Sequence, residues 1–243
     1  QNSVLGRVNK IFAKHATLLT FGINPINVPK GLADYLYIGN PLRKDILNNV
    51  HTKYFPLVKG EFTILVVGGS QGASFISKVV PIAVQRIKLA DQKSIKIYHQ
   101  SGDQDINSIK KQYIKDKIKV EIKPFFENIA ELMARSQLII CRAGASTLTE
   151  LCAMGRPSIL IPLPGSIGDH QYFNAKSLET NGAAKILQQD TVTVELLAST
   201  ISEYINNPEL GRVMAKAARK LKKLNAASVL ADIIISEVAK NKC

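Results

Sequence analysis

The chain of 243 residues contains no tryptophan and only three cysteines, Cys141, Cys152 and Cys243. Their spacing is not that of metal ligands or of an even disulfide framework. Because Cys141 and Cys152 lie in apolar runs, we expect them to be reduced core residues of a cytosolic protein. No run approaches the roughly 18 apolar residues that a membrane-spanning helix needs, and no signal peptide is visible. Apolar residues still make up 46% of the chain, which allows a substantial core.

Acidic residues are also few, with 19 against 32 basic residues and a net charge of +13. Such a balance favours an anionic partner, such as a nucleic acid, a nucleotide or an acidic membrane surface. Nucleic acid is disfavoured, because aromatic residues are not interleaved with the basic ones and no known nucleic-acid-binding module is visible. Lysines on solvated helix faces explain the charge equally well.

From residue 61 onward, strand-like and helix-like segments alternate. Continuous apolar runs such as 64–67 and 138–140 are typical of strands buried on both faces of a parallel sheet. The alternation predicts an α/β fold with a doubly wound parallel sheet. Strands are expected at residues 62–67, 95–99, 118–122, 138–141, 158–161 and 184–187, each followed by a helix. A basic amphipathic helix over 4–14, short strands at 16–21 and 35–38, and a polar linker at 48–60 are expected before them.

A glycine-rich turn, Gly68-Gly69-Ser70-Gln71-Gly72-Ala73, follows the first of these strands. Glycines let the backbone approach a ligand closely, and the N–H groups of the following helix start can bind phosphate. The turn lacks the Lys-Ser/Thr of a Walker motif and the spacing of a dinucleotide fingerprint. A tight strand-to-helix connection without a ligand is an equally good interpretation of the turn alone.

A second turn of similar build, Arg142-Ala143-Gly144-Ala145-Ser146-Thr147, follows the fourth strand, and Glu150 lies one helical turn later. A carboxylate there could accept hydrogen bonds from two neighbouring ribose hydroxyls, or simply complement the helix dipole. Because ligands bind beyond the carboxyl ends of parallel strands, both turns and the 162–170 loop can converge on one cleft. Two such turns indicate a nucleotide or sugar-nucleotide site.

Three polar side chains elsewhere are further candidates. Gln171 and Asn174 lie one turn apart at an expected helix start, where amides could bind sugar hydroxyls. Arg43 follows Gly39-Asn40-Pro41 and is either a surface arginine or a diphosphate clamp, since a guanidinium pairs bidentately with phosphate. No Ser/His/Asp, Cys/His or metal-ligand arrangement is visible in the sequence.

Five motifs together resemble the MurG family of bacterial N-acetylglucosaminyltransferases, in order and spacing, over essentially the whole chain. They span residues 1–6, 39–43, 68–73, 142–150 and 170–175. The resemblance implies a GT-B glycosyltransferase fold with two Rossmann-like domains. We expect residues 1–43 to be a remnant of the N-terminal acceptor-binding domain, 44–225 the complete UDP-sugar-binding domain, and 226–243 a helix that packs back on the N-terminal domain.

The resemblance also implies an activity at the cytoplasmic face of the bacterial inner membrane, with the chain bound peripherally. GlcNAc would move from UDP-GlcNAc to undecaprenyl-pyrophosphoryl-MurNAc-pentapeptide, converting lipid I to lipid II with inversion and without a metal or other cofactor. An anionic membrane surface would be a partner, and nucleic acid would not.

The family's binding residues carry over by matched position. Asn2 and Gln171 would contact GlcNAc, with Asn174 in support. Arg43 and Ser70 would hold the diphosphate, and Glu150 the ribose. The backbone of Phe126 would meet the uracil, at a position where the family commonly has Ile. The remaining matched residues line the nucleotide or shape the turns: Ala145, Ser146, Thr147, Gly68, Gly69, Gly72 and Gly144.

One departure from the family is large. The family begins with a domain that carries a glycine-rich loop and a His, thought to hold the acceptor diphosphate and take part in catalysis, and nothing here matches it. The chain starts at Gln1, inside the family's His-Glu-Gln-Asn motif. We therefore expect a fragment or processed product whose catalytic base is absent. Alone, it is expected to bind UDP-GlcNAc weakly or not at all and to transfer no sugar. A non-catalytic UDP-sugar-binding remnant, and a GT-B transferase for another UDP-sugar, are the alternatives.

Overall fold

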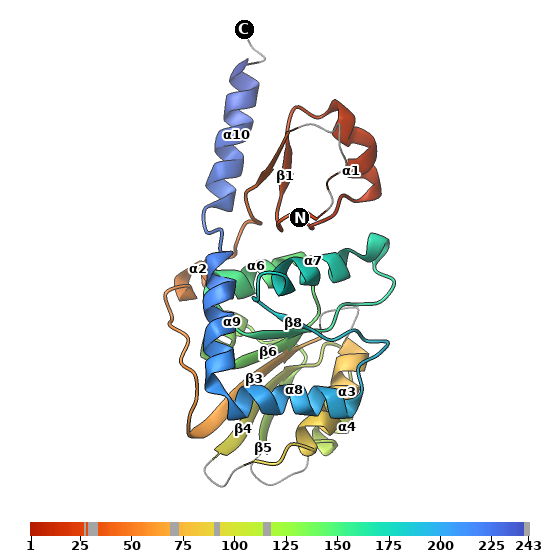
Figure 1. Cartoon of the computed structure of the whole chain (residues 1–243), viewed down its shortest axis with the longest axis vertical. Coiled ribbons are helices and arrows are strands. Elements are labelled where there is room, and N and C mark those ends of the chain that lie inside the picture. Colours follow the sequence, from red (N-terminus) through yellow and green to blue (C-terminus); the bar gives the residue numbers. More distant parts are fainter. Residues whose placement is uncertain (27, 29–33, 69–72, 90–92, 114–117, 241–243) are drawn as a thin grey trace.

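The main sheet contains six parallel strands in the order β5-β4-β3-β6-β7-β8 (Figure 1). The computed structural model describes residues 1–26, 28, 34–68, 73–89, 93–113 and 118–240, so Gly69, Ser70 and Gly72 lie outside the described residues. The strands are β3 (Gly60–Val67), β4 (Lys93–Gln100), β5 (Ile118–Lys123), β6 (Leu138–Cys141), β7 (Ser158–Leu160) and β8 (Lys185–Ile186). This is the doubly wound Rossmann order, which confirms the predicted fold class.

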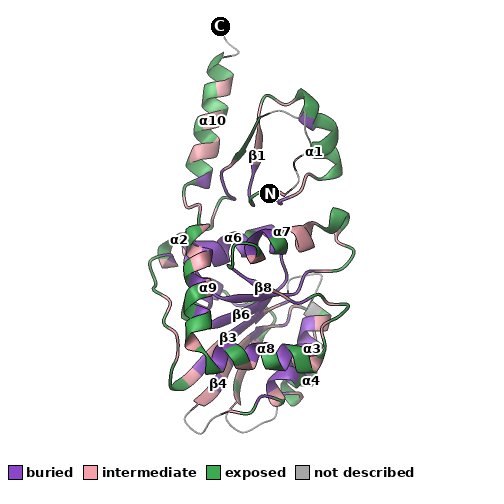
Figure 2. Cartoon of the chain, in the orientation of Figure 1, coloured by how far each residue is buried: buried purple, intermediate pink, exposed green. Residues whose placement is uncertain are grey.

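Helices cover both faces of this sheet, and buried residues fill the space between the layers (Figure 2). Leu65 packs with one core cluster, whereas Ile64 and Val66 pack with the other, because successive side chains of a strand point to opposite faces. One face carries α5 (Ile129–Arg135), α6 (Ala145–Met154), α7 (His170–Glu179) and α9 (Pro208–Lys220). The other carries α3 (Ala73–Gln85), α4 (Ile106–Lys111) and α8 (Val194–Asn206).

The described residues of the segment 1–37 and the last helix of the chain form a smaller region at one end of the molecule (Figure 1). It contains α1 (Arg7–Phe12), the 3-10 turn η1 (Ala13–His15), the parallel pair β1 (Leu19–Phe21) and β2 (Tyr35–Tyr37), and α10 (Ala226–Lys240). Tyr37 joins its two parts, because its hydroxyl donates a hydrogen bond to the Leu221 carbonyl at 3.2 Å.

Some boundaries predicted from the sequence are wrong. The start of the predicted linker, residues 48–49, closes helix α2 (Lys44–Asn49), whose Ile46 is fully buried. The helix expected after the 118–122 strand begins only at Ile129, because the N–H of Phe126 donates to the side chain of Gln100 instead of entering a helix. No helix in the described part of the chain is long and apolar enough to cross a membrane.

Candidate functional site

The two glycine turns leave the sheet side by side. β3 and β6 are neighbours, and Val67 pairs in register with Cys141, so Gly68 and Arg142 begin their turns at the same level. From β3 the strand order runs outward to β5, and from β6 it runs outward in the opposite direction to β8. The carboxyl ends of β3 and β6 are therefore the topological switch point, where open α/β sheets bind ligands. Gly144 is the N-cap of α6 and carries no side chain that could occupy the first N–H groups. These N–H groups are therefore available to an anion.

Arg43 and Glu150 form an ion pair above this edge of the sheet. Arg43 Nε donates to Glu150 Oε1 at 3.0 Å, while Arg43 Nη1 lies 3.7 Å from Asp45 Oδ2. The Glu150 side chain is only 11% exposed and that of Arg43 is 50% exposed. Burial raises the pKa of Glu150, and the hydrogen bond and charge of Arg43 oppose that shift. The structure thus joins two residues that the sequence assigns to different parts of a ligand.

Asn40 explains how Arg43 is placed. Its buried side-chain amide donates to the Thr149 hydroxyl at 3.0 Å and to the Gln1 carbonyl at 3.2 Å. The segment before Arg43 is therefore fixed to α6 at Thr149, the residue that precedes Glu150. The sequence carries Asn40 only as part of a motif, and nothing in it reveals that Thr149 is its partner.

Gln171 bridges two loops at the same edge. Its Oε1 accepts hydrogen bonds from the N–H groups of Ala143, at 3.2 Å, and Leu163, at 3.0 Å. The carbonyl of the amide is thus turned to the protein backbone. The Nε2 group is the part left for a ligand, so Gln171 can offer donors there but not its carbonyl oxygen.

Asn174 is completely buried and joins the N-terminal segment to the second glycine turn. Its Oδ1 accepts from the Ser3 N–H at 2.8 Å, and its Nδ2 donates to Asn2 Oδ1 at 2.9 Å and to the Ala143 carbonyl at 3.3 Å. These contacts occupy the amide, so Asn174 positions Asn2 and is not itself open to a ligand. Asn2, Asn174 and Gln171 are thereby brought together around Ala143.

Phe126 lies near the carboxyl end of β4, and its ring packs edge-to-face against Tyr98 in the core. Its N–H donates to Gln100 Oε1 at 3.1 Å. The other matched residues differ in exposure: Ala145 is buried, Thr147 is half-buried, and Ser146 is exposed at the start of α6. The backbone role expected of Phe126 remains a prediction.

Arg142 is a residue whose role the sequence did not reveal. Its buried guanidinium donates to the carbonyls of Ile161, at 2.9 Å, and Pro162, at 3.2 Å, and to Gln189 Oε1, at 2.7 Å. Nε is buried without a partner among the residues that the structure describes, and burial lowers the pKa of Arg142. The side chain therefore ties the ends of β6, β7 and β8 together. The position of an arginine directly after an apolar strand is the one sequence feature that could have indicated this role.

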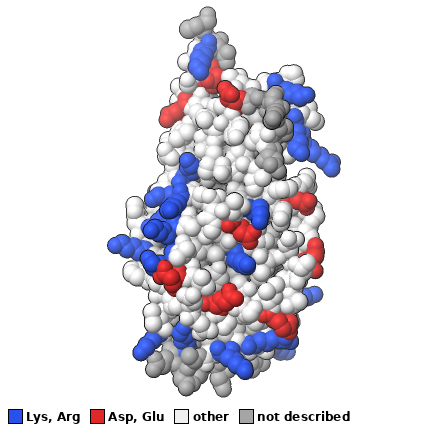
Figure 3. All heavy atoms as spheres, viewed as in Figure 1, with Lys and Arg blue, Asp and Glu red and all other residues white. Residues whose placement is uncertain are grey.

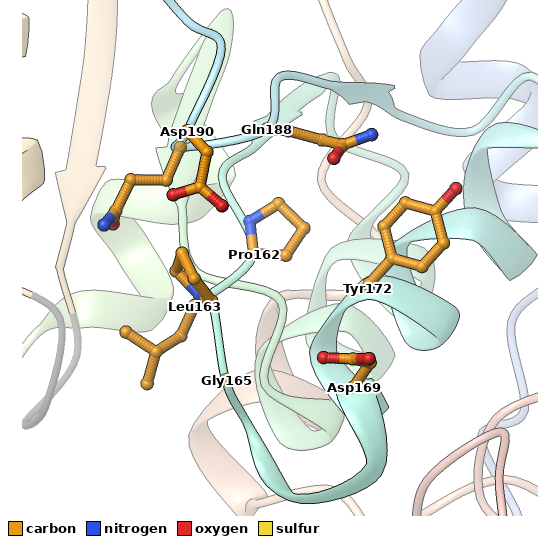
Figure 4. Close-up of a pocket in the computed structure, with 9 residues that line it drawn as sticks. Pro162, Leu163, Gly165, Asp169, Tyr172, Gln188 and Asp190 are labelled. Carbon is orange, nitrogen blue, oxygen red and sulfur yellow. The ribbon is translucent and has the colours of Figure 1, made fainter.

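A cavity of about 310 Å³ lies beside the start of α7, bounded by residues 162–165, Asp169, Tyr172 and 188–190 (Figure 4). Figure 4 shows Tyr172 and Asp190 on opposite sides of Pro162. Gln171 lies next to this cavity through its bond to Leu163. No group of three or more His, Cys, Asp or Glu side chains within the described ranges could hold a metal ion.

The chain is similar to a known family of glycosyltransferases and to named members of it. Residues 63–232 match the glycosyltransferase family 28 C-terminal domain. The UDP-N-acetylglucosamine–N-acetylmuramyl-(pentapeptide) pyrophosphoryl-undecaprenol N-acetylglucosamine transferase of Sinorhizobium fredii is 36% identical over 96% of this chain and 63% of its own length. The enzyme of the same name from Caulobacter vibrioides is 37% identical over 96% of this chain and 65% of its own. The chain thus spans less than two thirds of these relatives.

Solved structures of glycosyltransferases are also similar to this chain. MurG of Acinetobacter baumannii superposes with a TM-score of 0.78 at 32% identity, covering 97% of this chain and 65% of that one. UGT2 of Phytolacca americana shares the fold alone, with a TM-score of 0.59 at 14% identity, over 91% of this chain and 53% of that one. The predicted resemblance to MurG and the GT-B type of fold are confirmed. Because the family model matches most of the chain, residues 63–232, this chain belongs to glycosyltransferase family 28.

Proposed function

We propose that this chain provides the donor site of an inverting glycosyltransferase that moves GlcNAc from UDP-GlcNAc to lipid I, giving lipid II. The observation that carries the proposal is the paired exit of the two glycine turns from β3 and β6, with Arg43 and Glu150 above the second turn. Helix N–H groups for an anion and a buried carboxylate for a diol are what a nucleoside diphosphate requires. The names of the relatives specify the sugar and the acceptor.

The proposed roles follow the geometry. The N–H groups at the start of α6, Arg43, and Ser70 with Gly68, Gly69 and Gly72 would hold the diphosphate. They would stabilise the charge that develops on UDP as it leaves. Glu150 would accept the ribose hydroxyls, and the backbone at Phe126 would meet the uracil. Asn2 and Gln171 would hold GlcNAc, with Ala145, Ser146 and Thr147 along the nucleotide.

The catalytic base and most of the acceptor surface lie outside this chain in our proposal. Residues 1–43 would belong to the acceptor-binding domain, 44–225 form the donor domain, and 226–243 pack against the acceptor-binding domain. The assembled enzyme would sit peripherally on the cytoplasmic face of the inner membrane. The net charge of +13 supports this place through attraction to anionic lipid.

Calorimetric titration of the chain with UDP-GlcNAc, UDP-GalNAc and UDP-glucose tests the donor role. We expect UDP-GlcNAc to bind most tightly, and Glu150→Gln to weaken it by about tenfold or more, because a charged hydrogen bond contributes about 1.5–3 kcal/mol. Glu131→Gln is the matched control, since Glu131 is an exposed acid in the first turn of α5. Preference for another UDP-sugar, or equal effects of both variants, would contradict the proposal.

A further inference from the structure

Arg142 and Gln171 are joined by a closed ring of hydrogen bonds. The Arg142 guanidinium donates through Nη1 to the Pro162 carbonyl at 3.2 Å. The N–H of the next residue, Leu163, donates to Gln171 Oε1 at 3.0 Å, and the same oxygen accepts from the Ala143 N–H at 3.2 Å. Because Ala143 follows Arg142 in the sequence, both N–H groups that hold this oxygen are connected to Arg142, one through its side chain and one through its backbone.

One peptide group transmits the position of Arg142 to Gln171. The Pro162 carbonyl and the Leu163 N–H belong to the same planar, trans peptide group, in which the oxygen and the hydrogen point in opposite directions. Arg142 holds the oxygen on one side, so the N–H points to the other side, where Gln171 lies. A second bond from Nη1, to the Ile161 carbonyl at 2.9 Å, fixes the preceding residue as well.

Packing alone does not hold this loop in place. Residues 162–165 line the cavity of about 310 Å³ beside α7 (Figure 4), so the loop has open space on that side. Gln189, which lines the same cavity, accepts a hydrogen bond from Arg142 Nη2 at 2.7 Å. Without the guanidinium between these two segments, the loop could move into the cavity and turn the Leu163 N–H away from Gln171.

The charge of Arg142 is costly where it lies. Among the lysines and arginines that the structure describes, only Arg142 and Arg156 are buried, whereas Figure 3 shows basic side chains spread over the surface, where water solvates them. No carboxylate in the described ranges pairs with Arg142, and burial lowers its pKa. A buried charge without an opposite charge lowers stability. An apolar side chain would avoid that loss but could not hold the loop.

The orientation of the Gln171 amide decides what it offers to a ligand. With Oε1 turned to Ala143 and Leu163, Nε2 presents N–H donors on the other side, and sugar hydroxyl oxygens can accept them. An amide free to rotate would present its oxygen part of the time, and it would bind a fixed pattern of hydroxyls less tightly.

We propose that Arg142 is a positioning residue for the donor sugar, which fixes the Gln171 amide through the Pro162–Leu163 peptide group without touching the ligand. The inference rests on the proposed function, because Gln171 is assigned there to GlcNAc. The bonds of Arg142 lead to Gln171 and not to Arg43 or Glu150. Arg142 therefore acts on the recognition of the sugar and not on that of the nucleotide.

Calorimetric titration of the chain with UDP-GlcNAc and with UDP tests this role. Arg142→Met should weaken UDP-GlcNAc binding by about tenfold, because the misplaced amide loses its bonds to the sugar, and should leave the affinity for UDP unchanged. Adding Arg142→Met to Gln171→Ala should weaken UDP-GlcNAc binding no further. Arg156→Met is the matched control. It removes the other buried arginine, so it should lower stability while the ratio of the two affinities stays the same.

Hydrogen exchange resolved by NMR tests the same arrangement without a ligand. The Leu163 N–H should exchange at least about tenfold faster in Arg142→Met than in the unmodified chain, because its bond to Gln171 is lost. The Ile161 N–H, which donates to the Cys141 carbonyl at 2.9 Å, should stay protected and is the internal control. Arg142→Lys keeps the charge and should fold. Its single ammonium group cannot reproduce the planar set of donors, so the exchange of Leu163 should rise there as well.

Three results would overturn the proposal: equal weakening of UDP and UDP-GlcNAc binding by Arg142→Met, the same change of affinity ratio in Arg156→Met, or unchanged exchange of the Leu163 N–H. If the unmodified chain binds no UDP-GlcNAc while the exchange of Leu163 rises as expected, the donor site and the sugar role of Arg142 are wrong, and its control of the Gln171 amide stands. If UDP-GlcNAc binds and the exchange does not change, the donor proposal stands and the role of Arg142 is wrong.

Discussion

Arg43 donates a hydrogen bond from Nε to the buried carboxylate of Glu150 at 3.0 Å, across 107 residues of sequence. An ionised carboxylate at 11% exposure is disfavoured by desolvation, and a nearby guanidinium offsets that penalty. Arg43 therefore favours the ionised form of Glu150, which is the form that would accept two ribose hydroxyls in our proposal. It has this role in the free protein, whatever it contacts when a nucleotide is bound.

Removing Arg43 should change the pH dependence of nucleotide binding. Burial raises the pKa of Glu150 and Arg43 opposes the shift, so Arg43→Met should raise this pKa further. Loss of UDP-GlcNAc affinity on acidification should then begin at a higher pH than in the unmodified chain. Since Arg43 is half exposed, the cost in the free energy of unfolding should be only about 0.5–1 kcal/mol. Calorimetric titrations between pH 4.5 and 8 measure the shift.

Lys44→Met is the control for that experiment. Lys44 is the exposed neighbour of Arg43, and its loss removes one positive charge without moving the pH profile. An Arg43→Met profile that coincides with that of Lys44→Met would show that Arg43 does not act through Glu150.

The roles of the two polar atoms of the Gln171 amide, Oε1 and Nε2, can be tested separately. Gln171→Glu keeps an oxygen for the N–H groups of Ala143 and Leu163 but removes the amide donors. We expect near-normal stability and a loss of UDP-GlcNAc affinity of at least tenfold. Gln171→Ala leaves both N–H groups without their partner, which should cost about 1–3 kcal/mol of unfolding free energy as well. Urea denaturation and calorimetry on both variants separate the two effects. Equal stability of the two variants would mean that the hydrogen bonds from these two N–H groups contribute nothing.

The sequence predicted the order and type of the elements in the main sheet because buried parallel strands and amphipathic helices have distinct apolar patterns. It could not predict the pairing of β3 with β6, although that pairing puts Gly68 beside Arg142. Strand neighbours depend on which helices cover which face, and no local pattern encodes that choice.

The same limit applies to the site. The sequence made Glu150 and Gln171 candidates through their residue types, their positions at helix starts and the resemblance to MurG. Arg142 and Asn40 act through carbonyls and hydroxyls that lie 19–109 residues away. Such partners become visible only in three dimensions.

His99 should make the protein sensitive to acid. It is completely buried on β4, with Nδ1 2.9 Å from the Tyr113 hydroxyl and Nε2 3.0 Å from the Ser77 hydroxyl. Burial lowers its pKa from 6.5 to about 4. The unfolded chain therefore binds a proton that the folded chain resists, so stability is full above pH 6.5 and falls between pH 6.5 and 4. The loss from this one group is on the order of 3 kcal/mol.

Urea denaturation at pH 7, 6, 5 and 4.5 checks the effect of His99. His99→Gln keeps a donor and an acceptor but does not titrate, so its stability should fall less steeply over this range. His51→Gln, at an exposed histidine, should follow the unmodified chain. Parallel curves for all three proteins would rule out His99 as the source of acid sensitivity.

Arg156 should be a major contributor to stability and not to ligand binding. It is fully buried and donates to the carbonyls of Met133, at 3.1 Å, and Thr52, at 3.0 Å, with the ring of Tyr54 alongside. Arg156→Met fills the space but leaves these carbonyls unpaired, so we expect a loss of about 2–4 kcal/mol in unfolding free energy. Arg156→Lys should not restore the lost stability, because one ammonium group cannot reproduce the planar arrangement of N–H donors in a guanidinium. Arg135→Met, at an exposed arginine of α5, should cost less than about 0.5 kcal/mol. The folded Arg156→Met protein should bind UDP-GlcNAc with unchanged affinity, because Arg156 contacts Thr52, Tyr54 and α5. A large loss of affinity would show that these elements couple to the nucleotide site.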